Sequence, residues 1–467
     1  MLLKNTPYPV FNSVFRFTSF EPINLKTSPL KNITFLFLTA FSSLSLTAQN
    51  YIGHRIDNYS GIHGVMYNPA SVFDSRMRAD INLISFGVSA GNDYAGLNLT
   101  ELGSGEEGFD FEEEVNQNPT DANNFYINTD VMGPSFMFNL SPKSSIGLIT
   151  RVRGMFNINN ISGTLYENVT NDFDTEQDFD FAIENLSGTA HIFAEIGVAY
   201  GRQLLNKEQH FLKGGVTLKY LNGAGGLFIH SPNLNGSYNA AQETLPTTGS
   251  LNYGTTVDFD NEDISFESLS SGFGADVGFI YEFRPETQDM SLRSQNKYKL
   301  KLGVSITDLG ALRYDESTIN HYEVTGTVNT QEFEDEDVET VLDENYTGTE
   351  TLETVKLSLP TALHLMADYH LKNKFYVNLQ TSLSMISNTQ ERANRITNSL
   401  TLSPRIETKW FSAYMPLSIR QYAGFSWGLG LRAGPFTLGS ASALSNLMSS
   451  NSKAADVYLG LKIPIYQ

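Results

Sequence analysis

The sequence predicts an all-β protein, a transmembrane antiparallel β-barrel of about 14 strands. Three observations predict it: segments in which aliphatic and polar residues alternate, an N-terminus typical of export, and a composition rich in Phe and Tyr. The last segment, 456–466, shows the alternation in full. One face carries Val457, Leu459, Leu461, Ile463 and Ile465, and the other carries Asp456, Tyr458, Gly460, Lys462 and Pro464. Because side chains alternate across a strand, this segment fits between lipid and a wet lumen.

The alternation recurs along the chain and predicts further strands. It is clear at 145–156, 191–201, 212–221, 298–307, 362–371, 375–380 and 427–432. It is weaker at 79–90, 131–139, 251–259, 272–281, 321–330, 400–409 and 411–421. Short turns such as 141–143 and 372–373 are expected at the periplasmic end, and the long acidic insertions at the extracellular end.

Charged and polar residues occupy the face opposite the aliphatic one. We expect them to point into the lumen: Arg151, Arg153, Glu195, Lys213, Lys299, Lys301, His364, Asp368, His370 and Arg432. A soluble sandwich could also bury its aliphatic faces, but charge facing a packed core would be costly. The number of such strands favours the barrel. In its lumen the bases either supply positive charge toward a ligand or pair with inward acids such as Glu195 and Asp368.

The N-terminus predicts export. Lys26 and Lys31 precede an apolar run at 33–41, and small residues lead to a cleavage site after Ala48. The apolar run is too short to span a membrane as a helix. We therefore expect a signal region at 1–48, with 1–29 reflecting an over-extended start, an N-terminal segment at 49–77, and the barrel at 78–467.

Composition excludes several functions. The net charge of −20 argues against nucleic acid as a partner, and the absence of cysteine excludes disulfides and thiolate chemistry. Acidic stretches at 101–114, 172–184, 258–267 and 332–353 are expected to be loops. His364, Asp368 and His370 share one strand face and could bind a metal, but they lie too far apart without partners from other strands. We expect no cofactor and no enzymatic activity, since the usual catalytic patterns are missing.

Two short segments predict local features near the barrel rim. The glycine-rich stretch 222–226 predicts a bend, because glycine in a strand marks bulges and kinks. In the small-residue run 440–450, Leu444, Leu447 and Met448 have helical spacing. This spacing predicts a short helix that packs its apolar residues inward.

Residues 59–74 lack strand alternation and contain Asn68, Pro69 and Ala70, so we expect them to occupy the lumen. This tripeptide before a long barrel resembles the N-terminal hatch of FadL-type transporters and the related PorV-like barrels of Bacteroidota. Segments 305–310, 359–361, 430–440 and 458–465 resemble uncharacterised outer-membrane barrels of that phylum, including the PorP and SprF-like group. The resemblance implies that the protein lies in the outer membrane, in contact with outer-membrane lipid.

The sequence therefore predicts a gated outer-membrane channel for a hydrophobic or amphipathic small solute, with the N-terminal segment as its gate. The alternative is a docking or anchoring component for type IX-like secretion or surface-adhesin machinery. An outer-membrane enzyme is the least favoured reading.

Overall fold

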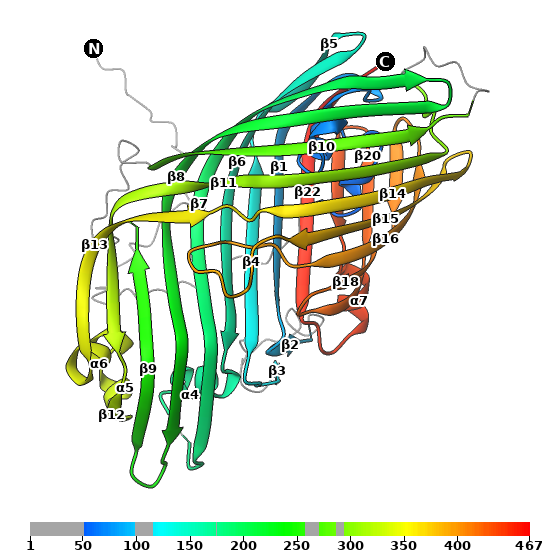
Figure 1. The fold of residues 1–467 in the computed structure, drawn as a ribbon. Coiled ribbons are helices and arrows are strands. Elements are labelled where there is room, and N and C mark those ends of the chain that lie inside the picture. Colours follow the sequence, from blue (N-terminus) through cyan, green and yellow to red (C-terminus); the bar gives the residue numbers. More distant parts are fainter. Residues whose placement is uncertain (1–50, 99–114, 174, 257–269, 286–293) are drawn as a thin grey trace, which may run out of the picture.

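A closed β-barrel is the central feature of the computed structural model, which describes residues 51–98, 115–173, 175–256, 270–285 and 294–467. It is a 14-stranded antiparallel barrel, as the sequence predicts. The first strand, β1 (Met77–Asn92), pairs with the last, β22 (Ala454–Tyr466), and this pairing closes the cylinder (Figure 1). The expected signal region and its cleavage site lie outside the described residues, as do the acidic stretches 101–114 and 258–267.

The strands follow one another around the barrel in sequence order, and several positions are built from two shorter pieces. From β1 the order is β4 (Asn123–Met132) with β5 (Ser135–Ser141), β6 (Ser144–Ile161), β7 (Phe179–Lys207), β8 (His210–Tyr238), β9 (Thr244–Thr255) with β10 (Ser270–Phe283), and β11 (Leu300–Glu323). There follow β13 (Thr347–Ser358) with β14 (Ala362–Lys372), β15 (Phe375–Ser384), β16 (Ser399–Glu407), β17 (Phe411–Tyr414) with β18 (Leu417–Arg420), β19 (Gly424–Trp427) with β20 (Leu429–Ala433), β21 (Phe436–Ser440) and β22.

Shorter elements lie in the connections. They are β2 (Ala95–Leu97), β3 (Val115–Gln117), β12 (Gly326–Asn329), and the helices α4 (Gly163–Thr170), α5 (Glu332–Asp335), α6 (Val338–Asn345) and α7 (Ala443–Met448). No helix in the described part of the chain has the length and apolar character to cross a membrane.

The barrel is apolar outside and charged inside. On β11, Leu302 and Val304 are each 41% exposed, whereas Lys301, on the opposite face of the strand, is only 8% exposed. The same inversion holds on β22, where Leu459 and Ile463 are exposed and Lys462 is buried. Aliphatic side chains turned outward on neighbouring strands need a lipid environment, so the barrel is a transmembrane one.

One side of the barrel is much taller than the other. β7 and β8 have 29 residues each, whereas β17 to β19 have four. A strand of that length extends about 95 Å, compared with a hydrocarbon core of about 30 Å. The far parts of β7, β8, β9, β11 and β13 therefore form a wall that projects beyond the short strands, with α4, α5 and α6 beside it (Figure 1).

Three local expectations can be compared with this fold. Residues 222–226 lie within β8 at a register shift against β7, and Gly225 has a φ of 153°, so the bend falls inside a long strand. The expected acidic loop 332–353 instead contains α5, α6 and half of β13, in which residues 347–351 carry no apolar side chain on either face. The helix predicted in 440–450 exists as α7, but inward packing was wrong: Leu447 and Met448 are 68% and 77% exposed.

Candidate functional site: the lumen and the N-terminal segment

Residues Tyr51–Arg76, the N-terminal segment, lie inside the barrel. Three short helices order the segment: η1 (His54–Ile56), α2 (Ile62–Val65) and η2 (Pro69–Val72). Gly53 directly precedes η1 and Gly61 directly precedes α2, both with positive φ, a conformation that glycine adopts without strain. The segment contacts β1 and β5 through α2, β20 through η1, and β6, β7, β8 and β10 through η2. It therefore reaches wall strands on several sides of the lumen.

The Asn68-Pro69-Ala70 tripeptide fixes the segment to the wall. Asn68 caps η2 by accepting a 3.0 Å hydrogen bond from Ala70 N through its Oδ1. Its Nδ2 donates to two wall carbonyls, Phe279 O at 3.2 Å on β10 and Val304 O at 3.1 Å on β11. One side chain thus starts the helix and binds it to two neighbouring strands.

A row of glycines makes room for this contact. Gly201 on β7 pairs with Gly215 on β8, which pairs with Gly278 on β10. A Cβ added at Gly215 would lie 2.5 Å from both Ala70 N and Pro69 C. Because those atoms belong to the backbone, they could not move aside locally, and the absence of side chains in this row lets η2 lie directly on the wall.

Charged groups hold the rest of the segment. Asp57 pairs with Arg432 of β20 at 2.9 Å. Asp74 pairs with Arg284, just after β10, at 2.5 Å. Lysines of the wall bind backbone carbonyls of the segment: Lys213 Nζ donates to Phe73 O at 2.6 Å, and Lys462 Nζ donates to Tyr59 O at 2.7 Å.

A continuous network of buried ion pairs lines the lumen beside the segment. It runs from Asp130 through Arg151, Glu195, Arg153, Asp308 and Lys219 to Asp276, with distances between 2.7 and 3.7 Å. These residues come from β4, β6, β7, β8, β10 and β11. Each charge in the network has an opposite charge beside it, which offsets the cost of removing it from water.

Most of the predicted lumen residues lie in the interior. Arg151, Arg153, Glu195, Lys213, Lys301, His364, Asp368 and Arg432 are all at most 8% exposed. Asp368 pairs with Arg405 at 2.6 Å, and His364 bonds to the hydroxyls of Thr307 and Ser382. No cluster of His, Asp and Glu in the described ranges is arranged to hold a metal ion.

Two of the predicted lumen residues lie at the turn end instead. Lys299 precedes β11 and donates to His370 O at 2.6 Å and to Leu371 O at 3.0 Å. The ring of His370 stacks on Tyr376, and its Nε2 lies 2.9 Å from Asn373 O in the turn. Lys299 lies one residue before β11 and His370 lies near the end of β14, so the alternation extends into the turn end of the barrel. Tyr298, the first residue of the expected strand 298–307, is buried and bonds to Asp368 and Asn58.

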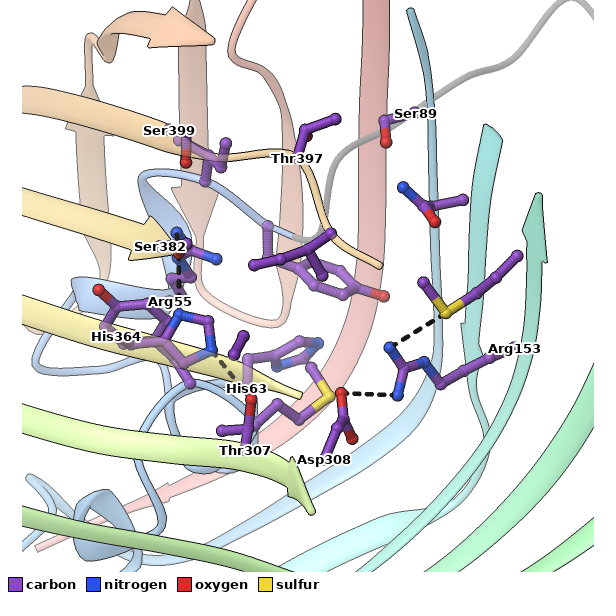
Figure 2. Close-up of a pocket in the computed structure, with 18 of the residues that line it drawn as sticks. Arg55, His63, Ser89, Arg153, Thr307, Asp308, His364, Ser382, Thr397 and Ser399 are labelled. Carbon is purple, nitrogen blue, oxygen red and sulfur yellow. Dashed lines mark hydrogen bonds and ion pairs between the residues drawn. The ribbon is translucent and has the colours of Figure 1, made fainter. Parts of the chain in front are cut away.

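A cavity of about 90 Å³, called the upper cavity below, lies beside the segment (Figure 2). Its wall combines polar groups such as Arg55, Arg153 and His364 with apolar ones such as Met66 and Met155. A second cavity of about 50 Å³ lies on the other side of Arg55 and Tyr67, lined by Asp57, Asp74, Lys213 and Lys301 among others. Because Arg55 and Tyr67 line both cavities, these two side chains separate them.

The loop between β15 and β16, residues 385–398, folds over the upper cavity. Ile396 and Thr397 of this loop line the upper cavity. Asn394 Nδ2 donates to Thr189 O at 3.2 Å, and Ser187 Oγ donates to Asn388 O at 2.9 Å. Neither this loop nor Arg55 lies in an alternating segment, and several of their hydrogen-bond partners lie more than 190 positions away, so the alternation does not reveal them.

Together the fold and the lumen define a transmembrane β-barrel with an internally seated N-terminal segment. The chain belongs to a family of unknown function, DUF5723, whose model matches residues 69–441. That match begins at Pro69, within the tripeptide that binds the wall.

No curated protein matches the chain. Among solved structures, it is similar to a FadL homologue from Pseudomonas aeruginosa, with 11% identity and a TM-score of 0.45, covering 91% of this chain and 99% of that one. It is also similar to the Pseudomonas putida toluene transporter TodX, with 8% identity and a TM-score of 0.42, covering 89% and 96%. At scores this low, we infer nothing about this chain from them.

Proposed function

We propose that this protein is an outer-membrane channel whose N-terminal segment, Tyr51–Arg76, acts as a plug that gates the lumen. The single observation that carries the proposal is the way the segment is held. It contacts the wall through hydrogen bonds, ion pairs and van der Waals contacts, as in Asp57 with Arg432 and Asn68 with two wall carbonyls. Such contacts can be exchanged for water, so the segment can leave its seat without breaking the barrel.

The solute that fits this lumen is small and amphipathic. The upper cavity has polar groups, among them Arg55 and Thr307, and apolar groups, among them Met66, Met155 and Ile396. A hydrophobic solute without a polar group would offer no acceptor to the remaining N–H groups of Arg55, which costs free energy. The charged N-terminal sequence before an apolar run supports export to the outer membrane, with the short turns in the periplasm.

Uptake into proteoliposomes tests the gate. Deleting 59–74 removes the contacts of α2 and η2, so a labelled small solute should enter faster than with the full chain. The control is deletion of 332–345, which removes α5 and α6 from the projecting wall and leaves the lumen contacts intact. Equal uptake by the full chain and the 59–74 deletion, with both folded on a heat-modifiability gel, would rule out gating by this segment.

A docking role for secretion or adhesin machinery is the second candidate, and the projecting wall favours it. β7 and β8 extend far beyond the length that a bilayer needs, and α5 and α6 lie at their level. Affinity capture from intact outer membranes separates the two roles: a stoichiometric protein partner lost on deleting 332–345 supports docking, and capture without one supports the channel.

A further inference from the structure

Arg55 lies where the two lumen cavities meet. Its Nε donates to Gln380 Oε1 at 3.0 Å, its Nη2 donates to Ser382 Oγ at 3.4 Å, and its Cζ lies 4.2 Å from the ring centre of Tyr67. All three partners are neutral. In contrast, the guanidinium groups of Arg151, Arg153 and Arg432 each contact a carboxylate.

The charge of Arg55 is therefore only partly compensated. A cation over an aromatic face gains some electrostatic stabilisation, but the ring accepts none of the hydrogen bonds that the five guanidinium N–H groups can donate. The two hydrogen bonds use N–H groups of Nε and Nη2, and the Arg55 side chain lines both cavities. A charge in such a place is costly unless an anion or ordered water neutralises or solvates it.

Neighbouring groups on the wall add unused donors. Gln380 is 1% exposed, and its Nε2 has no hydrogen-bond partner among the described residues. Asn378, two residues before it on β15, is fully buried and its Nδ2 also lacks a partner there. Both residues point to the lumen, because the alternation of β15 places 376, 378, 380 and 382 on that face.

Asp308, which lines the upper cavity, forms its ion pairs with other bases than Arg55. Asp308 pairs with Arg153 at 2.9 Å and with Lys219 at 2.7 Å. Around Arg55, His364 bridges the hydroxyls of Thr307 and Ser382, so that polar groups are held in place on the same side of the cavity (Figure 2). The surroundings of Arg55 thus combine one uncompensated cation with fixed, uncharged hydrogen-bonding groups.

We propose that the junction at Arg55 and Tyr67 is a binding site for a small monovalent anion, either an inorganic anion or the carboxylate of a small organic acid. The guanidinium supplies the charge and a planar donor fork, and Gln380 Oε1 holds it in place by accepting from Nε. Cavities of about 90 and about 50 Å³ on the two sides limit the bound part to a few atoms. Where the bound group is a carboxylate, the site specifies the polar end of the amphipathic solute of the channel proposed above, and binding does not require that the plug move.

Chloride-35 NMR on the full chain in detergent tests the site, with acetate as competitor. Binding broadens the chloride line in proportion to protein, and acetate should reverse the broadening if the carboxylate shares the site. Arg55→Met should weaken binding about tenfold or more, because it removes a charge-assisted donor pair. Arg55→Lys, which keeps the charge but loses the fork, should retain part of it.

The matched control is Arg313→Met. Arg313 is 61% exposed, pairs with Asp315 on the wall, and lies away from both cavities. Chloride broadening without reversal by acetate supports an inorganic anion, and reversal supports either source. The proposal is overturned if neither chloride nor acetate binds the folded full chain, or if Arg55→Met and Arg313→Met bind alike. The plug stays seated in the NMR measurement. The NMR result therefore does not depend on the outcome of the uptake assay.

Discussion

At the scale of single residues, the lumen depends on charges that are buried in pairs. Asp57 and Arg432 are fully buried in their ion pair, which joins two parts of the chain 375 residues apart. Removing one member of such a pair leaves the other without a partner in a place that water does not reach. Breaking the pair therefore costs more free energy than its formation contributes, so the pair helps to hold the segment in its seat.

Arg432→Met should therefore destabilise the folded barrel by about 3 to 5 kcal/mol, since Asp57 would remain buried and unpaired. Arg432 also donates to Thr408 O at 2.6 Å and to Ser412 Oγ at 2.7 Å, and these bonds would be lost as well. The midpoint of the heat-modifiability transition measures the change. Arg313→Met, which breaks an exposed pair, should shift it by at most about 1 kcal/mol. Equal shifts for the two variants would contradict this account of the lumen.

Two histidines of the segment predict a response to acid. Burial lowers the pKa of His63 to about 3 and holds the pKa of His54 well below its usual value, with Lys462 lowering both. A displaced segment would regain the ordinary histidine pKa of 6.5 and bind protons that the seated one excludes. Seating is therefore strongest above pH 6.5 and weakens as the pH falls, by roughly 2 kcal/mol at about pH 5 for His63, with His54 acting in the same direction.

A spin label at Ser71→Cys measures this response, because the natural chain has no cysteine. The label should become more mobile between about pH 7.5 and about pH 5, the range in which the two histidines of a displaced segment would take up protons. In a variant with His54→Gln and His63→Gln the mobility should change little. A pH response of the same size in both proteins would assign it to groups other than these histidines.

At the scale of elements, the glycine row on β7, β8 and β10 decides whether η2 can rest on the wall. Gly215→Ala would place a Cβ within 2.5 Å of Pro69 and Ala70 backbone atoms, so η2 should be displaced while the ladder persists. Gly154→Ala on β6 is the control, since its nearest neighbour would be Thr129 Cβ at 3.7 Å. Protease cleavage within 51–76 should rise for Gly215→Ala only, and unchanged cleavage would show that the close contact is not required.

The elements also show how far the sequence alone could lead. Strands with one lipid face and one lumen face, such as β11 and β22, were predictable because two environments impose a period of two. β13 was not, since its outer half projects beyond the membrane and meets water on both sides. The position of Lys299 was missed because the pattern does not mark where a strand ends.

The candidate site was less predictable than the fold. Asn68, Pro69 and Ala70 could be placed in the lumen because they interrupt the alternation before the first strand. Their partners could not be named, since Asn68 reaches residues 211 and 236 positions away and a single sequence contains no signal for such pairings. Arg55 was missed for the same reason, as its hydrogen-bond partners Gln380 and Ser382 lie 325 and 327 positions away.

At the scale of the whole molecule, the charge of the chain and the charge of the lumen differ in sign. The net charge is −20, yet the buried charged residues of the described ranges are thirteen Lys and Arg against eleven Asp and Glu. The excess acid therefore does not belong to the buried charged residues of the described ranges. An open lumen should favour anions over cations, and the reversal potential of an open variant in a salt gradient measures this preference. Cation preference would contradict it.

The central claim is that the seated segment closes the lumen of a membrane barrel. Single-channel current across a planar bilayer tests it most directly, with the full chain compared with Gly215→Ala at neutral pH. The full chain should be mostly closed, and Gly215→Ala should show frequent open steps, because only the variant disturbs the seat of η2. Equally frequent open steps of the same size in both proteins would contradict the claim.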